Sequence, residues 1–270
     1  MCIISRLALM VVFGLVLTIA SCKKSPQEPP KTPAETPPKA ETEAPKPAAQ
    51  PDTNAAPQQP AAQPSAAQPA AGMEPISIVL PKPVFIGTPE RIQGITNLEK
   101  PLGKARDPFY APRGTTNVAS KKPITSSDEQ PIIGELSMIT DGDKEAADGS
   151  YVELGPSKQH ITIDLGAPYN IYAVLVWHYH KQARVYKDVI VQVADDADFI
   201  TNVRTVFNND GDNTLGLGAG TNMNYVETAE GKLIDAKGVV ARYVRCYSNG
   251  NSANDLNNYI EVEVYGTAVK

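Results

Sequence analysis

Short runs of alternating apolar and polar residues dominate the chain from Asn117 onward, and they constrain its fold more than any other feature. In HITIDLG, three apolar residues, Ile161, Ile163 and Leu165, fall on one face of a strand, because successive side chains point to opposite sides. Similar runs are KDVIVQVADD, ARYVRCY and YIEVEVYG, and Gly, Asn and Asp clusters separate them. We find no amphipathic helix of useful length. These patterns predict an all-β protein, an antiparallel jelly-roll β-sandwich.

The N-terminus has the layout of a secretory signal. One basic residue, Arg6, precedes a short apolar run, and Ile19-Ala20-Ser21-Cys22 resembles the bacterial lipobox, where cleavage leaves a lipidated cysteine. An ordinary signal peptide that contains a cysteine is the alternative. Two or more acyl chains suffice for stable membrane attachment. Lys23 follows the cysteine, and by resemblance to Gram-negative lipoproteins this favours the outer membrane, with the domain on its periplasmic side or at the cell surface.

The composition divides the rest of the chain. The segment from Ser25 to Pro75 holds more than half of the chain's 24 prolines and no aromatic residue, so it cannot bury enough apolar surface to become ordered. The next segment keeps frequent prolines but gains apolar residues. The predicted organisation is a lipoprotein signal peptide over residues 1–21, a Pro/Ala/Gln-rich disordered linker over 22–75, an extended arm packed on the domain over 76–115, and the β-sandwich domain over 116–270.

Cysteine usage and charge narrow the class further. Of three cysteines, Cys2 leaves with the signal and Cys22 would carry lipid, so Cys246 remains alone and no internal disulfide forms. Cys246 lies in an alternating run, which predicts a small buried apolar residue. The net charge is −5 and no basic cluster occurs, which argues against nucleic acid as a partner.

Six segments follow one another from Asn117 to Gly266: NVASKKPITSSDE, ITDGDKEAADGSYVELG, HITIDLG, KDVIVQVADD, ARYVRCY and YIEVEVYG. In order and spacing they resemble the discoidin, or coagulation factor 5/8 type C, family. The resemblance implies a galactose-binding-like jelly roll. Many animal members close the domain with a terminal cysteine pair, which this chain lacks, so it is more similar to bacterial members, including carbohydrate-binding modules of secreted enzymes. Carbohydrate or glycoprotein is the partner that the resemblance implies.

An acidic loop, TDGDKEAADG, offers Asp141, Asp143 and Asp148 around two glycines. Oxygen ligands on a tight loop suit Ca²⁺, although the spacing is not that of an EF-hand. By resemblance to bacterial relatives, a structural calcium would be held by an Asp-Gly-Asp loop and a glutamate of the last strand. The matching residues are Asp141, Asp143 and Glu261, with Glu263 on the same side of its strand as an alternative. A solvated turn rich in Asp and Gly is the other interpretation.

A second acidic loop, NNDGDNTLGLGAGTNMN, carries Asp210 and Asp212. It could hold another ion, but a tight turn at Asp210-Gly211 explains the composition more simply. The glycines that follow do not stand between a strand and a helix, so a phosphate-binding loop is not expected.

The run AVLVWHYH holds the only tryptophan and two of the three histidines. Alternation places Leu175, Trp177 and Tyr179 on one face, and Val176, His178 and His180 on the other. A buried strand with hydrogen-bonded histidines is one interpretation. Two histidines at i and i+2 could instead ligate zinc, with His160 or a carboxylate as a third ligand.

Sugar contact is the third interpretation of this run. In sugar-binding relatives, the loop after the equivalent strand often carries a basic residue that bonds sugar hydroxyls, and aromatic rings pack on sugar C–H faces. The last loop, SNGNSANDLNN, adds amide and carboxylate side chains but no aromatic residue. The candidate ligand-binding residues are His178, Tyr179, His180, Arg184, Tyr186, Asn251, Asn254 and Asp255.

No catalytic constellation stands out. The carboxylates form no recognisable acid–base pair, and Cys246 lies within a strand without an assigned base. We therefore expect no enzyme but a membrane-tethered binding module that recognises carbohydrate, with a structural calcium. The alternative is an envelope lipoprotein whose jelly roll docks a protein partner. Polar loops favour the first expectation, since an apolar patch at the loop end would mark a protein partner.

Overall fold

The computed structural model describes residues 70–83, 92 and 94–270. The predicted signal peptide, the lipidated Cys22 and most of the predicted linker therefore lie outside the described residues. Within them, no helix is long and apolar enough to cross a membrane. The elements are β1 (Met73–Pro75), β2 (Tyr110–Pro112), β3 (Thr116–Asn117), β4 (Ile124–Ser126), the 3₁₀ helix η1 (Leu136–Thr140), β5 (Val152–Leu154), β6 (Lys158–His178), β7 (Ile190–Ala194), β8 (Arg204–Asn208), β9 (Lys232–Asn249) and β10 (Asn257–Ala268).

The strands confirm the predicted all-β antiparallel class. Eight strands are connected by hydrogen bonds, with six in the order β3-β10-β6-β9-β7-β8; β4 pairs with β6 and β5 with β10. Every pairing between named strands is antiparallel. The remaining pair, β1 and β2, forms a separate two-stranded sheet.

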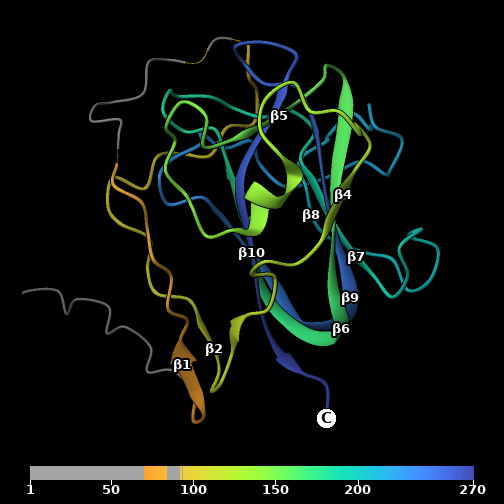
Figure 1. Cartoon of the computed structure of the whole chain (residues 1–270). Coiled ribbons are helices and arrows are strands. Elements are labelled where there is room, and N and C mark those ends of the chain that lie inside the picture. Colours follow the sequence, from red (N-terminus) through yellow and green to blue (C-terminus); the bar gives the residue numbers. More distant parts are fainter. Residues whose placement is uncertain (1–69, 84–91, 93) are drawn as a thin grey trace, which may run out of the picture. The chain divides into compact units, whose positions relative to one another are not determined.

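Two long strands, β6 and β9, turn one hydrogen-bonded sheet into two layers (Figure 1). Their pairing shifts register between Asp164 and Tyr169, next to Gly166, whose positive φ of 84° suits glycine. The first half of β6 pairs with β4, and the second half pairs with β10. The apolar side chains of both halves meet in one buried cluster, which is the core of the β-sandwich.

The alternation predicted from the sequence positions these side chains. Ile161, Ile163 and Leu165 are fully buried in the main cluster. Cys246 is also fully buried there, as expected, and burial raises the pKa of its thiol to about 12. Period-two patterning therefore identified the inward face of the core strands.

The second half of β6 is buried on both faces. Leu175 and Trp177 lie on the side opposite Val174 and Val176 and belong to a second cluster. Three apolar residues of the segment before β3 pack on this second cluster: Ile76, Ile78 and Phe109. The Ile76 N–H also donates to the Phe109 carbonyl (2.9 Å), and the Tyr265 hydroxyl donates to the Ser77 carbonyl (3.0 Å).

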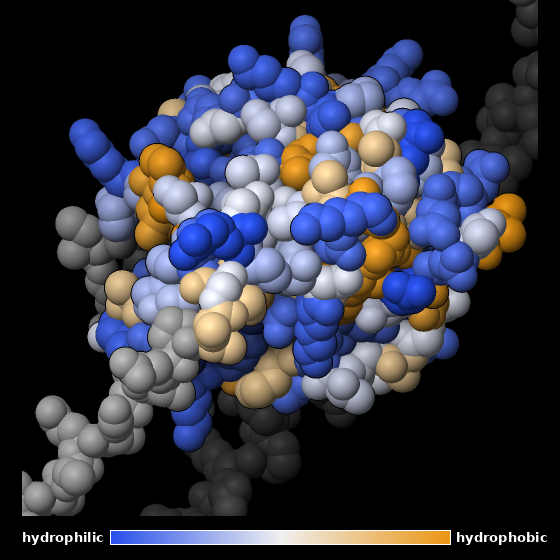
Figure 2. Space-filling view, turned by 90° about the horizontal axis from the view of Figure 1, so that it is seen from below, coloured by the Kyte–Doolittle hydropathy of each residue, from blue (hydrophilic) through white to orange (hydrophobic). Residues whose placement is uncertain are grey.

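Ordered chain begins before the predicted boundary at Ile76. Strand β1 lies inside the segment expected to be linker, because Met73 pairs with Pro112 and Pro75 with Tyr110 in an antiparallel ladder. The Gly114 N–H also donates to the Glu74 carboxylate (2.9 Å). The surface seen from below shows apolar groups interspersed among hydrophilic ones (Figure 2).

Trp177 lies directly behind the turn that leads into β9. Its indole N–H donates to the Ala229 carbonyl (3.1 Å), and a Cβ added at Gly231 would lie 2.6 Å from the indole ring. Gly231 also has a positive φ of 64°. No larger residue fits this position without a shift of the tryptophan or of the turn.

We expect Gly231→Ala to lower the unfolding free energy by about 2–4 kcal/mol, combining left-handed backbone strain with overpacking against Trp177. Gly216→Ala is the matched control, because its φ is 72° but no atom lies within 4 Å of the added Cβ. The control should lose only about 1–2 kcal/mol. Denaturant unfolding followed by tryptophan fluorescence measures both, and equal losses would contradict the steric explanation.

Candidate functional site

Two loops that are distant in sequence meet at one end of the sandwich. The loop after β6 and the loop between β9 and β10 are joined by backbone hydrogen bonds, from Lys187 N to the Gly250 carbonyl (3.0 Å) and from Ser252 N to the Val185 carbonyl (2.8 Å). The Ser252 hydroxyl also accepts from the Val185 N–H (3.1 Å). The structure thus brings together the two segments from which candidate ligand-binding residues were predicted.

An aromatic–arginine cluster, defined as Tyr151, Tyr179, Arg184 and Asn258, forms at this end. The Tyr151 and Tyr179 rings meet edge to face with centroids 5.1 Å apart, and the Arg184 guanidinium carbon lies 4.7 Å from the Tyr179 centroid. Arg184 donates weakly to Asn258 Oδ1 (3.4 Å) and to Gln182 Oε1 (3.3 Å). Tyr179 is 8% exposed and Asn258 is buried, so the half-buried Tyr151 and Arg184 are the members of the cluster that a ligand could contact.

Two members of the cluster were missed by the sequence analysis. Tyr151 follows the acidic loop and lies outside the segments searched for sugar contacts, whereas Asn258 ends the searched loop SNGNSANDLNN but was not selected. The Asn258 amide donates to Glu153 Oε2 (2.8 Å), which orients its oxygen toward Arg184 and the Tyr186 hydroxyl (2.9 Å). The alternation of the strand that ends in YIEVEVYG was the signal available for Asn258.

Three predicted ligand-binding residues are corrected by their burial: His178, Tyr186 and Asn251 are at most 1% exposed. The His178 ring stacks on Tyr186 (4.2 Å between centroids), and its Nδ1 lies 2.7 Å from Glu227 Oε1. Asn251 holds its own loop, accepting from the Ala253 N–H and donating to the Leu256 carbonyl (both 2.8 Å). Their side chains support the loops and do not face a ligand.

His180 is also buried, at 2% exposed. Its Nε2 lies 3.0 Å from the Lys144 carbonyl, so it points to the acidic loop and not to the aromatic–arginine cluster. Strand β6 ends at His178, so the predicted alternation does not extend to Tyr179 and His180. Asn254 and Asp255 are exposed at the tip of the last loop.

The zinc interpretation finds no support in the described part of the chain. The three histidines do not form a group of metal ligands there. His160 lies against Tyr247 (5.2 Å between centroids), whereas His178 is enclosed by Tyr186 and Tyr259. Burial, together with the charges of Arg245 and Lys158, lowers the pKa of His160 to about 4.

Two predicted calcium ligands, Glu261 and Glu263, lie buried beside the acidic loop, and Glu261 is the less fully paired of them. Its Oε2 accepts from the Gly142 N–H (3.2 Å), while its Oε1 has no hydrogen-bond partner among the described residues. Burial is the main reason why the pKa of this carboxyl is raised to about 8, with the nearby charges of Glu263 and Asp141 adding to the shift. Asp141 Oδ1 accepts from the Asp143 N–H (2.8 Å) within the loop.

Two predicted calcium ligands, Glu263 and Asp148, are each paired with a lysine. Glu263 forms a buried ion pair with Lys144 (2.8 Å) and accepts from the Tyr265 hydroxyl (2.9 Å). Asp148 pairs with Lys181 (3.1 Å), and its side chain is 86% exposed. These contacts correct both assignments, because each carboxylate already has a cationic partner.

In the described residues, the carboxylates that approach one another within 4.8 Å belong to Asp188, Asp210 and Asp212. Asp210 is fully buried, and its two oxygens accept from the Thr214 and Leu215 N–H groups (both 2.9 Å). These bonds agree with the tight-turn interpretation of the second acidic loop. The sequence analysis missed Asp188, which comes from the loop before β7.

Part of the β-sandwich domain matches a known protein family. Residues 138–246 match the family model described as a NedA-like, galactose-binding domain of the F5/8 type C group. Among curated proteins, none matches the chain.

Several solved structures are similar to the chain, each over little more than half of it. The CBM32 of AlyQ in complex with 4,5-unsaturated mannuronic acid is 20% identical, with 53% of this chain and 92% of that chain covered and a TM-score of 0.38. Chitosan-binding module 1 of a chitosanase/glucanase from Paenibacillus sp. IK-5 is 21% identical (56% and 99% covered, TM-score 0.37). The fucose-binding module SpX-3 of Streptococcus pneumoniae is 17% identical (57% and 99%, 0.39).

Larger proteins are also similar, but only over one of their parts. The chain covers 32% of a truncated AlyQ with CBM32 and alginate lyase domains (20% identity, 55% of this chain, TM-score 0.39). It covers 15% of a family 89 glycoside hydrolase from Clostridium perfringens (19% identity, 57% of this chain, TM-score 0.41). Residues 138–246 match the F5/8 type C family model, and the antiparallel β-sandwich to which they belong has the galactose-binding-like fold.

Proposed function

We propose that the chain is a non-catalytic module that binds carbohydrate at the loop end of its sandwich, through the aromatic–arginine cluster and the neighbouring loop tip. The observation that supports this most is the position of the Arg184 guanidinium over the Tyr179 ring, beside the loop that exposes Asn254 and Asp255. The domain family also includes galactose-binding members, as the description of the matching model states.

The chemistry of the cluster suits a sugar. Sugar rings present C–H groups that pack on aromatic faces, and hydroxyls that need fixed donors and acceptors. Arg184 has five N–H donors, and weak hydrogen bonds engage one N–H on each of its two terminal nitrogens, while its Nε is buried and faces no partner among the described residues. The guanidinium therefore keeps terminal N–H donors for ligand hydroxyls, and Asp255 supplies carboxylate oxygens. The Asn254 Oδ1 already accepts from the Asn251 amide (2.8 Å) and from the Leu256 N–H (3.0 Å).

The cluster is held in place before any ligand arrives. Asn258 is 1% exposed and is tied to Glu153, Tyr186 and Arg184. Such support limits the conformational entropy that binding would cost. Docking of a protein partner is the alternative function, and the polar side chains at the loop tip argue against it.

We also propose a structural calcium at Glu261. A buried carboxylate needs a compensating cation, and one oxygen of Glu261 has no partner among the described residues. Asp141 and Asp143 lie on the loop whose backbone contacts Glu261 and carry the oxygen ligands that calcium prefers, but the three carboxylates do not form a group within 4.8 Å, so the loop would have to close on the ion. The ion would neutralise this carboxylate and link the acidic loop to β10.

Attachment to the outer membrane by lipid at Cys22 is a further part of the proposal. Its support is the order of the sequence elements: an apolar run, small residues, the cysteine and then a polar proline-rich segment. A lipid anchor with that segment behind it would hold the domain away from the membrane, within reach of envelope or surface glycans.

The sugar-binding proposal is tested with a glycan array, followed by calorimetry of the full chain with any glycan that binds. Arg184→Ala should weaken binding by about 10- to 100-fold, the loss expected for hydrogen bonds from a charged group. Arg242→Ala is the matched control, because Arg242 pairs with Asp164 away from the loops, and it should bind as the wild type does. Unchanged affinity in Arg184→Ala, or no glycan binding by folded protein, would refute the proposal, and the second outcome would favour protein docking.

The calcium proposal is tested by unfolding with calcium and with chelator. At a calcium concentration 100 times the dissociation constant, the unfolding free energy should rise by about 2.7 kcal/mol. Glu261→Gln should lose this gain and yet fold, since the amide is close in size and shape to the neutral carboxyl that a pKa of about 8 implies without the ion. Asp148→Asn is the matched control on the same loop and should keep the gain. A calcium effect that survives in Glu261→Gln would place the ion elsewhere.

The anchor is tested by labelling cells that express the full chain with a clickable palmitate analogue. The wild-type chain should incorporate label and sediment with the outer membrane. Cys22→Ser should lose the label and appear in the soluble fraction, because a single acyl-bearing residue carries the attachment. Membrane association that persists in Cys22→Ser would show that another segment attaches the chain.

A further inference from the structure

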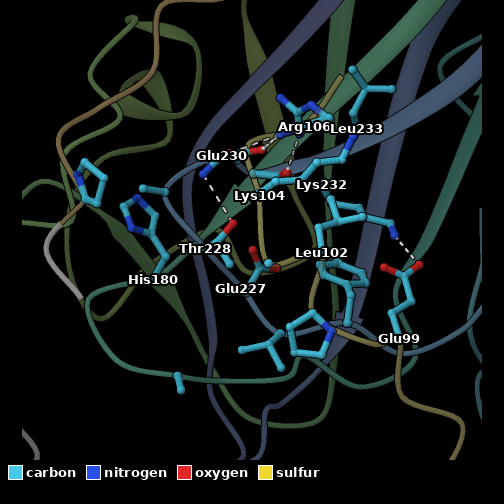
Figure 3. A pocket seen from close by; sticks show the side chains of 18 of the residues that line it. Glu99, Leu102, Lys104, Arg106, His180, Glu227, Thr228, Glu230, Lys232 and Leu233 are labelled. Carbon is cyan, nitrogen blue, oxygen red and sulfur yellow. Dashed lines mark hydrogen bonds and ion pairs between the residues drawn. The ribbon is translucent and has the colours of Figure 1, made fainter. Parts of the chain in front are cut away.

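A cavity of about 510 Å³ lies between the turn that precedes β9 and the segment before β2 (Figure 3). Residues 225–233 form one wall, residues 99–106 form the other, and His180 and Ala183 close one side. No member of the aromatic–arginine cluster lines it. The volume is in the range of small-molecule sites, so this is a second place where a ligand can bind.

The two walls are tied together. The Arg106 backbone N–H donates to Glu230 Oε2 (3.1 Å), and its guanidinium donates to the Gly231 carbonyl (2.9 Å). Glu99 forms an ion pair with Lys232 from the opposite wall. These bonds hold the cavity open without a ligand, which lowers the cost of binding.

Glu227 is the buried acidic residue in the wall of the cavity. The residue is 3% exposed and lines the cavity, as Figure 3 shows. Its Oε1 lies 2.7 Å from His178 Nδ1, while its Oε2 is buried and has no hydrogen-bond partner among the described residues. Leaving a buried carboxylate oxygen unpaired is costly, so a missing donor is expected at this position.

His180 supplies a second unpaired acceptor. Its Nε2 lies 3.0 Å from the Lys144 carbonyl, which can only accept, so Nε2 carries the proton. The Nδ1 of the neutral ring is then an acceptor, and it is buried without a partner in the described part of the chain. The Tyr225 hydroxyl, which also lines the cavity, is buried without a partner among the described residues and lies beside Glu227. It can donate one hydrogen bond but brings no positive charge, so an ammonium group with several N–H donors matches the two acceptors and the carboxylate.

Apart from the exposed Lys100 and the Tyr225 hydroxyl, the remaining lining is apolar or consists of charged groups that are paired within the protein. Pro101, Leu102 and Leu233 offer carbon surface. Lys232 is paired with Glu99, and Lys104 with Asp107. A ligand with a carbon body and N–H donors at one end matches this distribution.

We propose that the cavity binds a small organic ammonium compound, whose N–H groups bond to Glu227 Oε2 and His180 Nδ1 while its carbon body packs on Pro101 and Leu102. Amino sugars and aliphatic amines share this chemistry. The site is independent of the loop-end sugar site, and the loop from Tyr179 to Arg184 separates the two.

Trp177 provides the readout. It is the only tryptophan of the chain, and its indole lies behind the cavity wall at Ala229 and Gly231. The full chain is titrated with 1,4-diaminobutane and with D-glucosamine, each beside a neutral isostere, 1,4-butanediol or D-glucose. Fluorescence and calorimetry should both report binding of at least one amine at millimolar concentration or below, and at least 10-fold weaker binding of its isostere. Tighter binding of 1,4-diaminobutane would identify the ligand class as aliphatic amines, and tighter binding of D-glucosamine would identify it as amino sugars.

Glu227→Gln tests the assignment directly. The glutamine can still accept from His178, but it presents N–H groups to the ligand in place of an acceptor, so amine affinity should fall at least 10-fold. Leu102→Lys is a second variant at an exposed position (68%), where folding is not at risk and a new positive charge should repel the amine. Glu230→Gln removes the same charge from the lining without touching Glu227, and it should bind the amine more tightly than Glu227→Gln does.

Arg184→Ala separates this site from the proposed sugar site, because it should weaken glycan binding and leave amine binding unchanged. Equal binding of amine and neutral isostere, no amine binding at 10 mM, or unchanged affinity in both Glu227→Gln and Leu102→Lys would overturn the proposal. In those cases water alone satisfies the two acceptors.

Discussion

The antiparallel pairing of β6 with β9 is the interaction on which the rest of the structure depends. The two strands pair from Lys158 with Asn249 to Val176 with Lys232, and a register shift near Gly166 lets both strands bend together. Each strand therefore serves both layers, and their side chains fill the core between the layers. Because the strands turn back, the loop after β6 contacts the chain before β9 and the chain before β10 at one end of the sandwich.

That end of the molecule rests on a buried polar layer. The pair His178 and Glu227, and the bonds that Asn258 makes to Tyr186 and Glu153, lie beneath the loops. Buried polar groups must be paired, so these contacts fix which side chains of the loops turn inward. The residues left at the surface are those available to a ligand.

The segment before β3 covers one face of the sandwich and forms part of a cavity there. Ile76, Ile78 and Phe109 cover the outer face of the second half of β6, and residues 99–106 form a wall of the cavity beside Glu227. A domain without this segment would expose Leu175 and Trp177 to water, and the cavity would lose one of its two walls. The segment before β3 therefore adds a concave surface to the fold.

The sequence by itself determined the strands, the family and the inward residues of the core, because period-two alternation identifies a strand and its two faces. It placed Val174 and Val176 opposite Leu175 and Trp177, and it identified Cys246 as buried. Only the tertiary structure decided which polar side chains remain free. Alternation of apolar and polar residues identifies the two faces of a strand, but it does not show which segments cover each face. The hydrogen-bond partners of His178, Glu261 and Asp148 come from segments 49, 119 and 33 residues away. Such pairings arise when the long strands bend and bring distant loops together, and no local pattern records them.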